Sequence, residues 1–162
     1  RLTLLGFDQL DSGGHRAALN LWLESVFSQE FEYVANATLG GELSRLIVEL
    51  RAGDVMEHFN EFLVARDYLT RRGAVVAVDA LFPQLLDGLS LPDLGIRLAK
   101  LHATADDLPD LRRRRDRIAA LQQAGVTLVL CRTETEAIHR AGLEVGIRIF
   151  QGAIADRAVA GG

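Results

Sequence analysis

Six polar residues follow one another along the chain, each at or just past the carboxyl end of a predicted strand. They are Asn20, Glu49, Asp79, Lys100, Arg132 and Gln151. In a (β/α) barrel, this end of the strands forms the mouth where ligands bind. Taken singly, an acid such as Glu49 or Asp79 is more often a capping or ion-paired residue than a metal ligand. The ordered set favours a ligand site at the mouth without identifying the ligand.

The segments that would position these residues alternate between apolar strands and amphipathic helices. Strands are predicted near residues 16–21, 44–50, 74–79, 97–102, 126–131 and 146–151, and helices near 25–38, 54–73, 110–124 and 134–141. Strands that are apolar almost throughout are typical of a parallel sheet covered on both faces. In an open doubly wound sheet the ligand site would be concentrated at one switch point, so a polar residue on every strand favours a barrel. We predict an incomplete (β/α) barrel of about six parallel strands.

The composition is that of an ordinary soluble protein, with 49% hydrophobic and 25% charged residues among 162. This length predicts a single domain over residues 1–162. The net charge of -4 gives no overall attraction to nucleic acid or an anionic membrane, so we expect neither as a partner. No apolar run approaches the roughly 18 to 20 residues of a membrane span. Cys131 is the only cysteine, so no internal disulfide can form, and we expect a cytoplasmic protein.

Two other groups of residues could do chemistry, and each has a simpler explanation. The arginine run 112–115 with Arg117 could contact a nucleotide, but aspartates flank it, so we predict a solvated outer helix face. Cys131 and His102 could act as nucleophile and base on neighbouring strands, but a buried cysteine at a strand end is usually inert. The histidines lack metal-finger spacing, so no structural zinc site is expected.

Six segments are similar, in chain order, to motifs that occur together in one family. Leu19–Leu21 resembles an Asn-Leu-Ser strand, and Leu46–Leu50 resembles a Glu-Leu-Thr-Glu strand. Leu69–Ala80 resembles the segment that leads into Asp-Asp-Phe-Gly, and Leu98–His102 resembles a Lys-Ile-Asp strand. Ala124–Glu136 resembles an Ala-Glu-Gly-Val-Glu-Thr-Glu segment with a residue missing, and Phe150–Gly152 resembles a Gln-Gly-Tyr strand. These are motifs of the EAL-type cyclic di-GMP phosphodiesterases. The chain resembles a degenerate and truncated member of that family.

The resemblance implies a metal-dependent barrel of eight strands, from which this chain departs. By resemblance, Asn20, Glu49 and Asp79 would supply three ligands of one metal ion, and a second metal ion would complete two-metal phosphodiester hydrolysis. The Glu-Ala-Leu motif is absent from residues 1–14, so the barrel is short by its first two strands. At the positions that matter for the second metal, this chain has Ala80 for an aspartate, His102 for an aspartate and Arg132 for a glutamate.

These departures predict a domain with no catalytic residue, no metal and no cofactor. The residues left as candidate ligand contacts, by resemblance, are Asn20, Glu49, Asp79, Lys100, Arg132, Glu134 and Gln151. Such a domain would act in bacterial signal transduction through an upstream domain or partner protein, with or without bound cyclic di-GMP. The alternative is a magnesium-dependent cyclic di-GMP phosphodiesterase whose N-terminal strands lie outside this sequence. A barrel-like domain used only for dimerisation is a third reading.

Two further expectations concern the charge at the mouth and the opening of the barrel. Arg132 replaces a metal ligand and would need compensation if partly buried, so we predict that it pairs with Glu49 or Asp79. An incomplete barrel leaves edge and core exposed, which predicts a homodimer or cover by an upstream domain. The sequence starts at Arg1 without methionine or a signal-peptide pattern, as expected for an excised piece. Its first apolar residues should lie at the opening: Leu2, Leu4, Leu5, Phe7 and Leu10.

Overall fold

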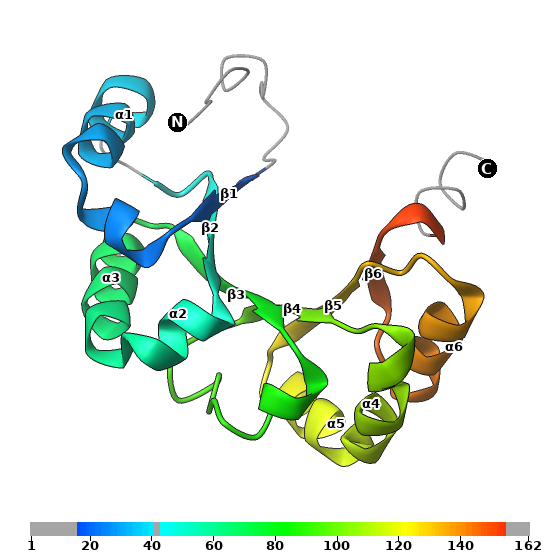
Figure 1. Ribbon diagram of the computed structural model, residues 1–162. Coiled ribbons are helices and arrows are strands. Elements are labelled where there is room, and N and C mark those ends of the chain that lie inside the picture. The colour runs from blue at the N-terminus through cyan, green and yellow to red at the C-terminus, as the bar shows by residue number, and fades with distance from the viewer. Residues whose placement is uncertain (1–15, 41–42, 155–162) are drawn as a thin grey trace. The chain divides into compact units, whose positions relative to one another are not determined.

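A computed structural model describes residues 16–40 and 43–154 (Figure 1). Its elements are β1 (Ala17–Leu21), the 3₁₀ helix η2 (Leu23–Phe27), α1 (Gln29–Leu39), β2 (Leu46–Arg51), α2 (Ala52–Glu57), α3 (Phe59–Arg71), β3 (Val75–Leu81), η3 (Pro83–Leu85), β4 (Leu98–His102), η4 (Ala105–Asp107), α4 (Leu108–Arg113), α5 (Arg115–Gln123), β5 (Thr127–Cys131), α6 (Glu136–Glu144) and β6 (Ile149–Gln151). The apolar residues at positions 2–10, expected to cover an opening, lie outside the described residues.

The strands are parallel and follow one another in chain order. Parallel pairing joins β1 to β2, β3 to β4, β4 to β5 and β5 to β6, and the order along the sheet is β1-β2-β3-β4-β5-β6. A doubly wound sheet would reverse this order at a switch point, whereas a (β/α) barrel keeps it. The predicted fold class, an incomplete (β/α) barrel of six parallel strands, is confirmed.

The chain divides into two compact units, Arg1–Val76 and Ala77–Gly162, which we call the N-terminal and C-terminal units. In the N-terminal unit, α3 buries Phe62, Ala65 and Leu69, whose spacing places them on one helix face. Helix α1 begins where the Ser28 hydroxyl accepts a hydrogen bond from the Phe31 N–H at 3.1 Å. These contacts fix the segments that follow β1 and β2.

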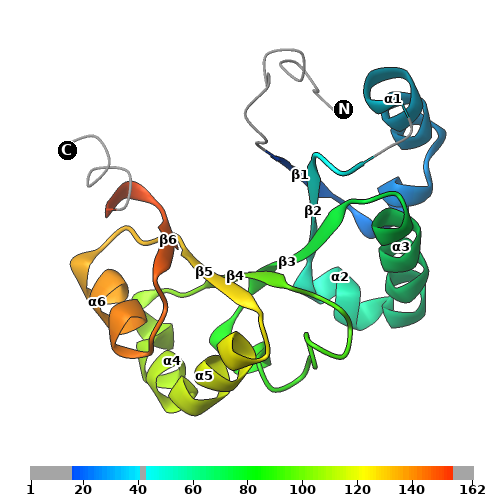
Figure 2. The ribbon, with the colours of Figure 1, turned by 180° about the vertical axis from the view of Figure 1, so that it is seen from behind.

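In the C-terminal unit, helices α4, α5 and α6 lie on one side of strands β4 to β6 (Figure 2). Helix α6 approaches the strands closely at Gly142. A Cβ atom there would lie 2.7 Å from a methyl carbon of Leu130 and 2.7 Å from a ring carbon of Phe150. Because real Cβ contacts are longer than this, the glycine sets how near α6 comes to β5 and β6.

The predicted elements differ from the observed ones mainly in their interruptions. The helix expected over 25–38 is preceded by the separate 3₁₀ helix η2, and the helix expected from 54 breaks at His58, where φ is -119° and ψ is 52°. The helix expected over 110–124 breaks at Arg114. The periodicity of hydrophobic residues alone does not reveal such breaks. No helix within the described ranges is both long and apolar enough to cross a bilayer.

Candidate functional site

In the N-terminal unit, two candidate residues lie opposite each other at the carboxyl ends of neighbouring strands. Asn20 of β1 is in register with Glu49 of β2. Asn20 is exposed, whereas Glu49 is buried, with only 4% of its surface exposed. Parallel strands end at the same edge of a sheet, so the motif positions predicted from sequence are adjacent here.

In the C-terminal unit, the carboxylate of Asp79 is engaged by a histidine. Nε2 of His102 lies 3.1 Å from Oδ1 of Asp79, and both side chains are mostly buried, 14% and 17% exposed. The pKa of Asp79 is lowered chiefly because His102 hydrogen-bonds to it. Burial opposes this lowering of the pKa, and the Ala80 N–H and the charge of Lys100 add to it. An ionised carboxylate only accepts, so Nε2 of His102 carries the donated proton.

A row of polar residues continues from this pair across the strands. His102 is in register with Cys131 of β5, and Cys131 with Gln151 of β6. The Cys131 thiol donates to Oε1 of Gln151 at 3.4 Å. We call Asp79, His102, Cys131 and Gln151 the polar row. The sequence offers two of its members, His102 and Cys131, as a base and a nucleophile, but in the structure His102 hydrogen-bonds to Asp79 and Cys131 to Gln151.

Beyond β5, the buried Thr133 anchors the loop to β6. Its backbone N–H and its hydroxyl both donate to the carbonyl oxygen of Gln151, at 3.2 and 3.1 Å. Gly152 follows with φ of 140°, and a Cβ there would lie 2.6 Å from the Thr133 nitrogen. Sequence reasoning missed Thr133, because a threonine between charged residues gives no signal of burial.

Two residues beside the row have left-handed backbone. Ala80 has φ of 52° and Arg132 has φ of 57°, and the pairing of β3 with β4 shifts register between Val78 and Leu81. This conformation costs an L-residue other than glycine roughly 1–2 kcal/mol. The strain lies where the resemblance places the second aspartate and the replaced glutamate.

Arg132 was predicted to pair with Glu49 or Asp79; the pairing with Asp79 is wrong, and the pairing with Glu49 stays a prediction. Asp79 pairs with His102 instead, and Arg132 is exposed. The prediction assumed that Arg132 was partly buried, and an exposed guanidinium needs no such partner because water solvates it. Glu134 is likewise exposed, while Lys100 is half-buried. The convergence of all six strand-end residues at one mouth stays a prediction.

At two positions where the resemblance places ligands of a second metal ion, this chain has side chains that are poor metal ligands. Ala80 offers no oxygen donor from its side chain, and Arg132 brings a positive charge. The Asp79 carboxylate already accepts a hydrogen bond from His102. Among the described residues, no three His, Cys, Asp or Glu side chains gather closely enough to hold a metal ion.

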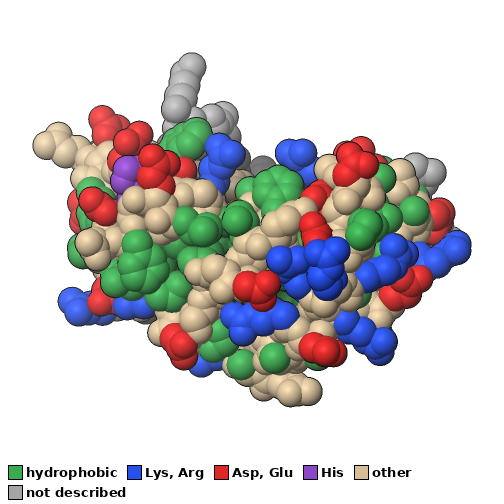
Figure 3. Space-filling view, turned by 60° about the horizontal axis from the view of Figure 1, so that its bottom comes forward, with side chains coloured by type: hydrophobic (Ala, Val, Ile, Leu, Met, Phe, Trp, Pro, Cys, Tyr) green, Lys and Arg blue, Asp and Glu red, His purple; other side chains and the backbone are tan. Residues whose placement is uncertain are grey.

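The arginine run is solvated at Arg112 and Arg113, as predicted, whereas the Arg114 side chain is only 18% exposed. Arg112 pairs with Glu144, Arg113 with Asp110, and Arg114 with Asp87 and Asp110. Arg117 donates to the carbonyl oxygens of Leu86 and Leu89. Figure 3 shows acidic side chains scattered among the basic ones on this face of the molecule. The internal partners account for most of the run.

Comparison with family models and with curated proteins finds no match to this chain. Solved structures do match. BlrP1 of Klebsiella pneumoniae, in a complex with calcium and cyclic di-GMP, is 22% identical with a TM-score of 0.69, over 89% of this chain and 39% of that one. The ligand-free S helix-GGDEF-EAL region of Vibrio cholerae LapD is 21% identical with a TM-score of 0.67, over 88% and 37%.

A third match is an isolated domain. The EAL domain of Xanthomonas citri FimX, in complex with cyclic di-GMP, is 15% identical with a TM-score of 0.64. The match covers 91% of this chain and 62% of that domain. The chain thus spans less than two thirds of the structures it matches. The sequential parallel strands and these matches together lead to one conclusion: the chain has the fold of part of an EAL domain.

Proposed function

We propose that this chain is a cyclic di-GMP signalling domain that does not hydrolyse the nucleotide and acts through protein contacts. Two of the structures that share its fold, BlrP1 and FimX, contain cyclic di-GMP, which supports this ligand class. The single observation that carries the lack of hydrolysis is the Asp79–His102 hydrogen bond at 3.1 Å. The His102 imidazole hydrogen-bonds to the Asp79 carboxylate. A metal ion at this place would need that carboxylate as a ligand.

Hydrolysis of a phosphodiester needs an activated water and a positive charge on the phosphate oxygens. At the strand ends, Arg132 and Lys100 provide positive charge for the second requirement, and we propose that none of the described residues activates a water for the first. Asp79 is held ionised by His102, and the buried thiol of Cys131 donates to Gln151. A site of this kind binds phosphate better than it cleaves it.

The same residues suit recognition of an anionic dinucleotide. Cyclic di-GMP carries two phosphodiester charges, and the exposed guanidinium of Arg132 can form two parallel hydrogen bonds to one of them. Lys100 would add a second cation, and Asn20, Glu134 and Gln151 are polar groups for the bases or sugars. We propose weak binding, with the signal passed to an upstream domain, a partner protein or a second copy of the chain.

Calorimetry and product analysis test both halves of the proposal. We expect cyclic di-GMP to bind with similar affinity with and without Mg²⁺, and no linear dinucleotide on anion-exchange chromatography after long incubation. Arg132→Gln should weaken binding about tenfold, whereas Arg140→Gln, which removes an exposed arginine of α6, should not. Linear dinucleotide that forms only with Mg²⁺ would instead establish the alternative, a phosphodiesterase.

A further inference from the structure

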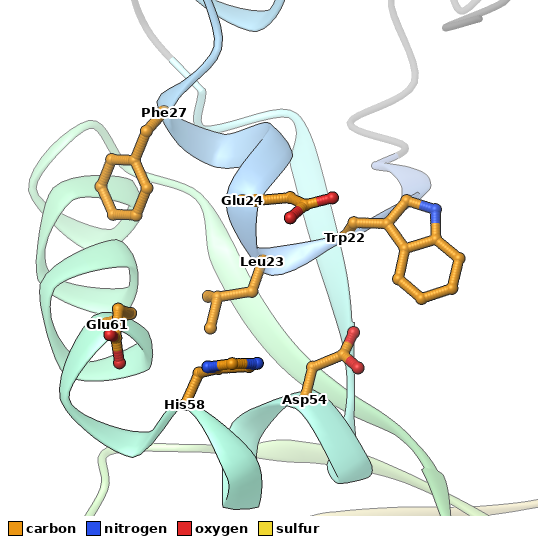
Figure 4. Close-up of a pocket in the computed structure, with 7 residues that line it drawn as sticks. All are labelled: Trp22, Leu23, Glu24, Phe27, Asp54, His58 and Glu61. Carbon is orange, nitrogen blue, oxygen red and sulfur yellow. The ribbon is translucent and has the colours of Figure 1, made fainter.

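A second site lies in the N-terminal unit, in a pocket of about 450 Å³. Figure 4 shows its lining: Trp22, Leu23, Glu24, Phe27, Asp54, His58 and Glu61. These residues come from the segment after β1, from α2 and from α3. Its volume is within the range of small-ligand sites. All of the described lining residues belong to one compact unit.

The pocket combines negative charge with an aromatic wall. It has three carboxylates, Glu24, Asp54 and Glu61, and within the described part of this unit none of them forms an ion pair. Oδ2 of Asp54 is buried and accepts no hydrogen bond. A buried acceptor without a donor costs about 1–3 kcal/mol.

The aromatic wall is exposed, and its tryptophan already contacts one guanidinium of this chain. The Trp22 and Phe27 side chains are 56% and 52% exposed. The Arg51 guanidinium carbon lies 5.3 Å from the centroid of the Trp22 ring, in a cation–π contact. In Figure 4 the carboxylates of Glu24 and Asp54 point toward the side of the pocket where the Trp22 ring lies.

We infer that this pocket binds an arginine side chain on a partner protein. A planar guanidinium stacks on an aromatic ring and donates to carboxylates with a fixed geometry, which suits Trp22 beside Glu24 and Asp54. A protein partner is favoured over a free cation because apolar side chains next to the pocket in sequence, Met56 and Phe59, are each 42% exposed and provide area for the residues around the arginine. Binding of this arginine does not depend on nucleotide binding.

Trp22 is the only tryptophan, so its fluorescence reports on the pocket directly. A tetra-arginine peptide should change this fluorescence saturably, a tetra-lysine peptide less, and a tetra-glutamate peptide not at all. The affinity should fall as NaCl rises, because salt screens exposed charges. The double variant Glu24→Gln with Asp54→Asn should bind the peptide at least about tenfold more weakly.

The matched control removes two acids outside the pocket, Glu30→Gln with Asp116→Asn, both exposed. It should keep the parent affinity. Equal weakening in both double variants, or no saturable change with tetra-arginine, would overturn the inference, since net charge or nothing at all would then explain the result. A Trp22 response to cyclic di-GMP that the arginine peptide does not compete with would assign the pocket to the nucleotide. Failure of nucleotide binding alone leaves the arginine result unaffected.

Discussion

The polar row of the C-terminal unit and the acidic pocket of the N-terminal unit differ in whether their buried polar groups have hydrogen-bond partners. In the row, the carboxylate of Asp79 has a donor in His102 and Cys131 has an acceptor in Gln151. In the pocket, Oδ2 of Asp54 has no donor. Polar groups that satisfy one another stabilise the fold and leave little for a ligand, whereas an unsatisfied group is available for one. The row is therefore expected to contribute to stability and the pocket to recognition.

The largest effect should follow from removing the donor in the row. His102→Leu removes the side-chain hydrogen bond to the mostly buried Asp79 carboxylate and leaves it only the Ala80 N–H, and should lower the free energy of unfolding by about 1–3 kcal/mol. Urea unfolding followed by circular dichroism measures this. The comparison variant is His58→Leu, at an exposed histidine of the pocket, which should change the free energy by less than about 0.5 kcal/mol. Equal losses in both variants would contradict the contrast.

The contribution of Asp79 should depend on pH. Its folded pKa lies below the ordinary value of 3.8, first because of the hydrogen bond from His102. A carboxyl group with a lowered folded pKa stabilises the fold above its unfolded pKa and loses that contribution as pH falls through the folded pKa. The difference in unfolding midpoint between the parent chain and Asp79→Asn should thus be full above pH 3.8 and shrink below it. If the difference in unfolding midpoint stayed constant down to acid pH, the assignment of Asp79 as an ionised partner of His102 would be wrong.

Relief of backbone strain next to the row should stabilise the chain. Ala80 has φ of 52°, so Ala80→Gly should raise the free energy of unfolding by about 1 kcal/mol. The control is Ala120→Gly, at an exposed position inside α5, which should lower it by about 0.5–1 kcal/mol. Thermal unfolding of the three proteins separates the two signs. A loss at both positions would mean that Ala80 carries no relievable strain.

The smallest effect is expected in the pocket. Asp54→Asn removes the charge of a carboxylate whose buried oxygen has no donor, and should change the free energy of unfolding by less than about 0.5 kcal/mol in either direction. Urea unfolding beside His102→Leu makes the comparison direct. A loss as large as that of His102→Leu would show that Asp54 stabilises the fold and would weaken its assignment to recognition.

Sequence alone predicts the strands of this chain well and its side-chain pairs poorly. The apolar runs before Glu49 and Asp79 are sufficient to place both acids near strand ends, because strand length and hydrophobicity are local properties. The partner of Asp79 depends on register between strands, and His102 rather than Arg132 is the one within hydrogen-bonding reach. The left-handed backbone of Arg132 leaves no mark in residue type.

The pocket could not be predicted for a related reason. Trp22 and Glu61 are far apart in sequence, and no motif joins them. A tryptophan placed directly after an apolar strand is the one local signal, because so large an apolar side chain is rarely left exposed. Such a tryptophan indicates a binding surface, but which acidic side chains lie beside that surface depends on tertiary packing.

The close approach at Gly142 constrains how this part of the chain can change over generations. A side chain at that position meets Leu130 and Phe150 at once, so a larger residue is acceptable only if one of those two becomes smaller in the same lineage. Substitutions at residues in contact are not additive. Residues on the outer faces of the helices can be substituted one at a time, whereas the residues of this contact must be substituted together. We therefore expect them to change more slowly between related sequences than the exposed residues at the strand ends.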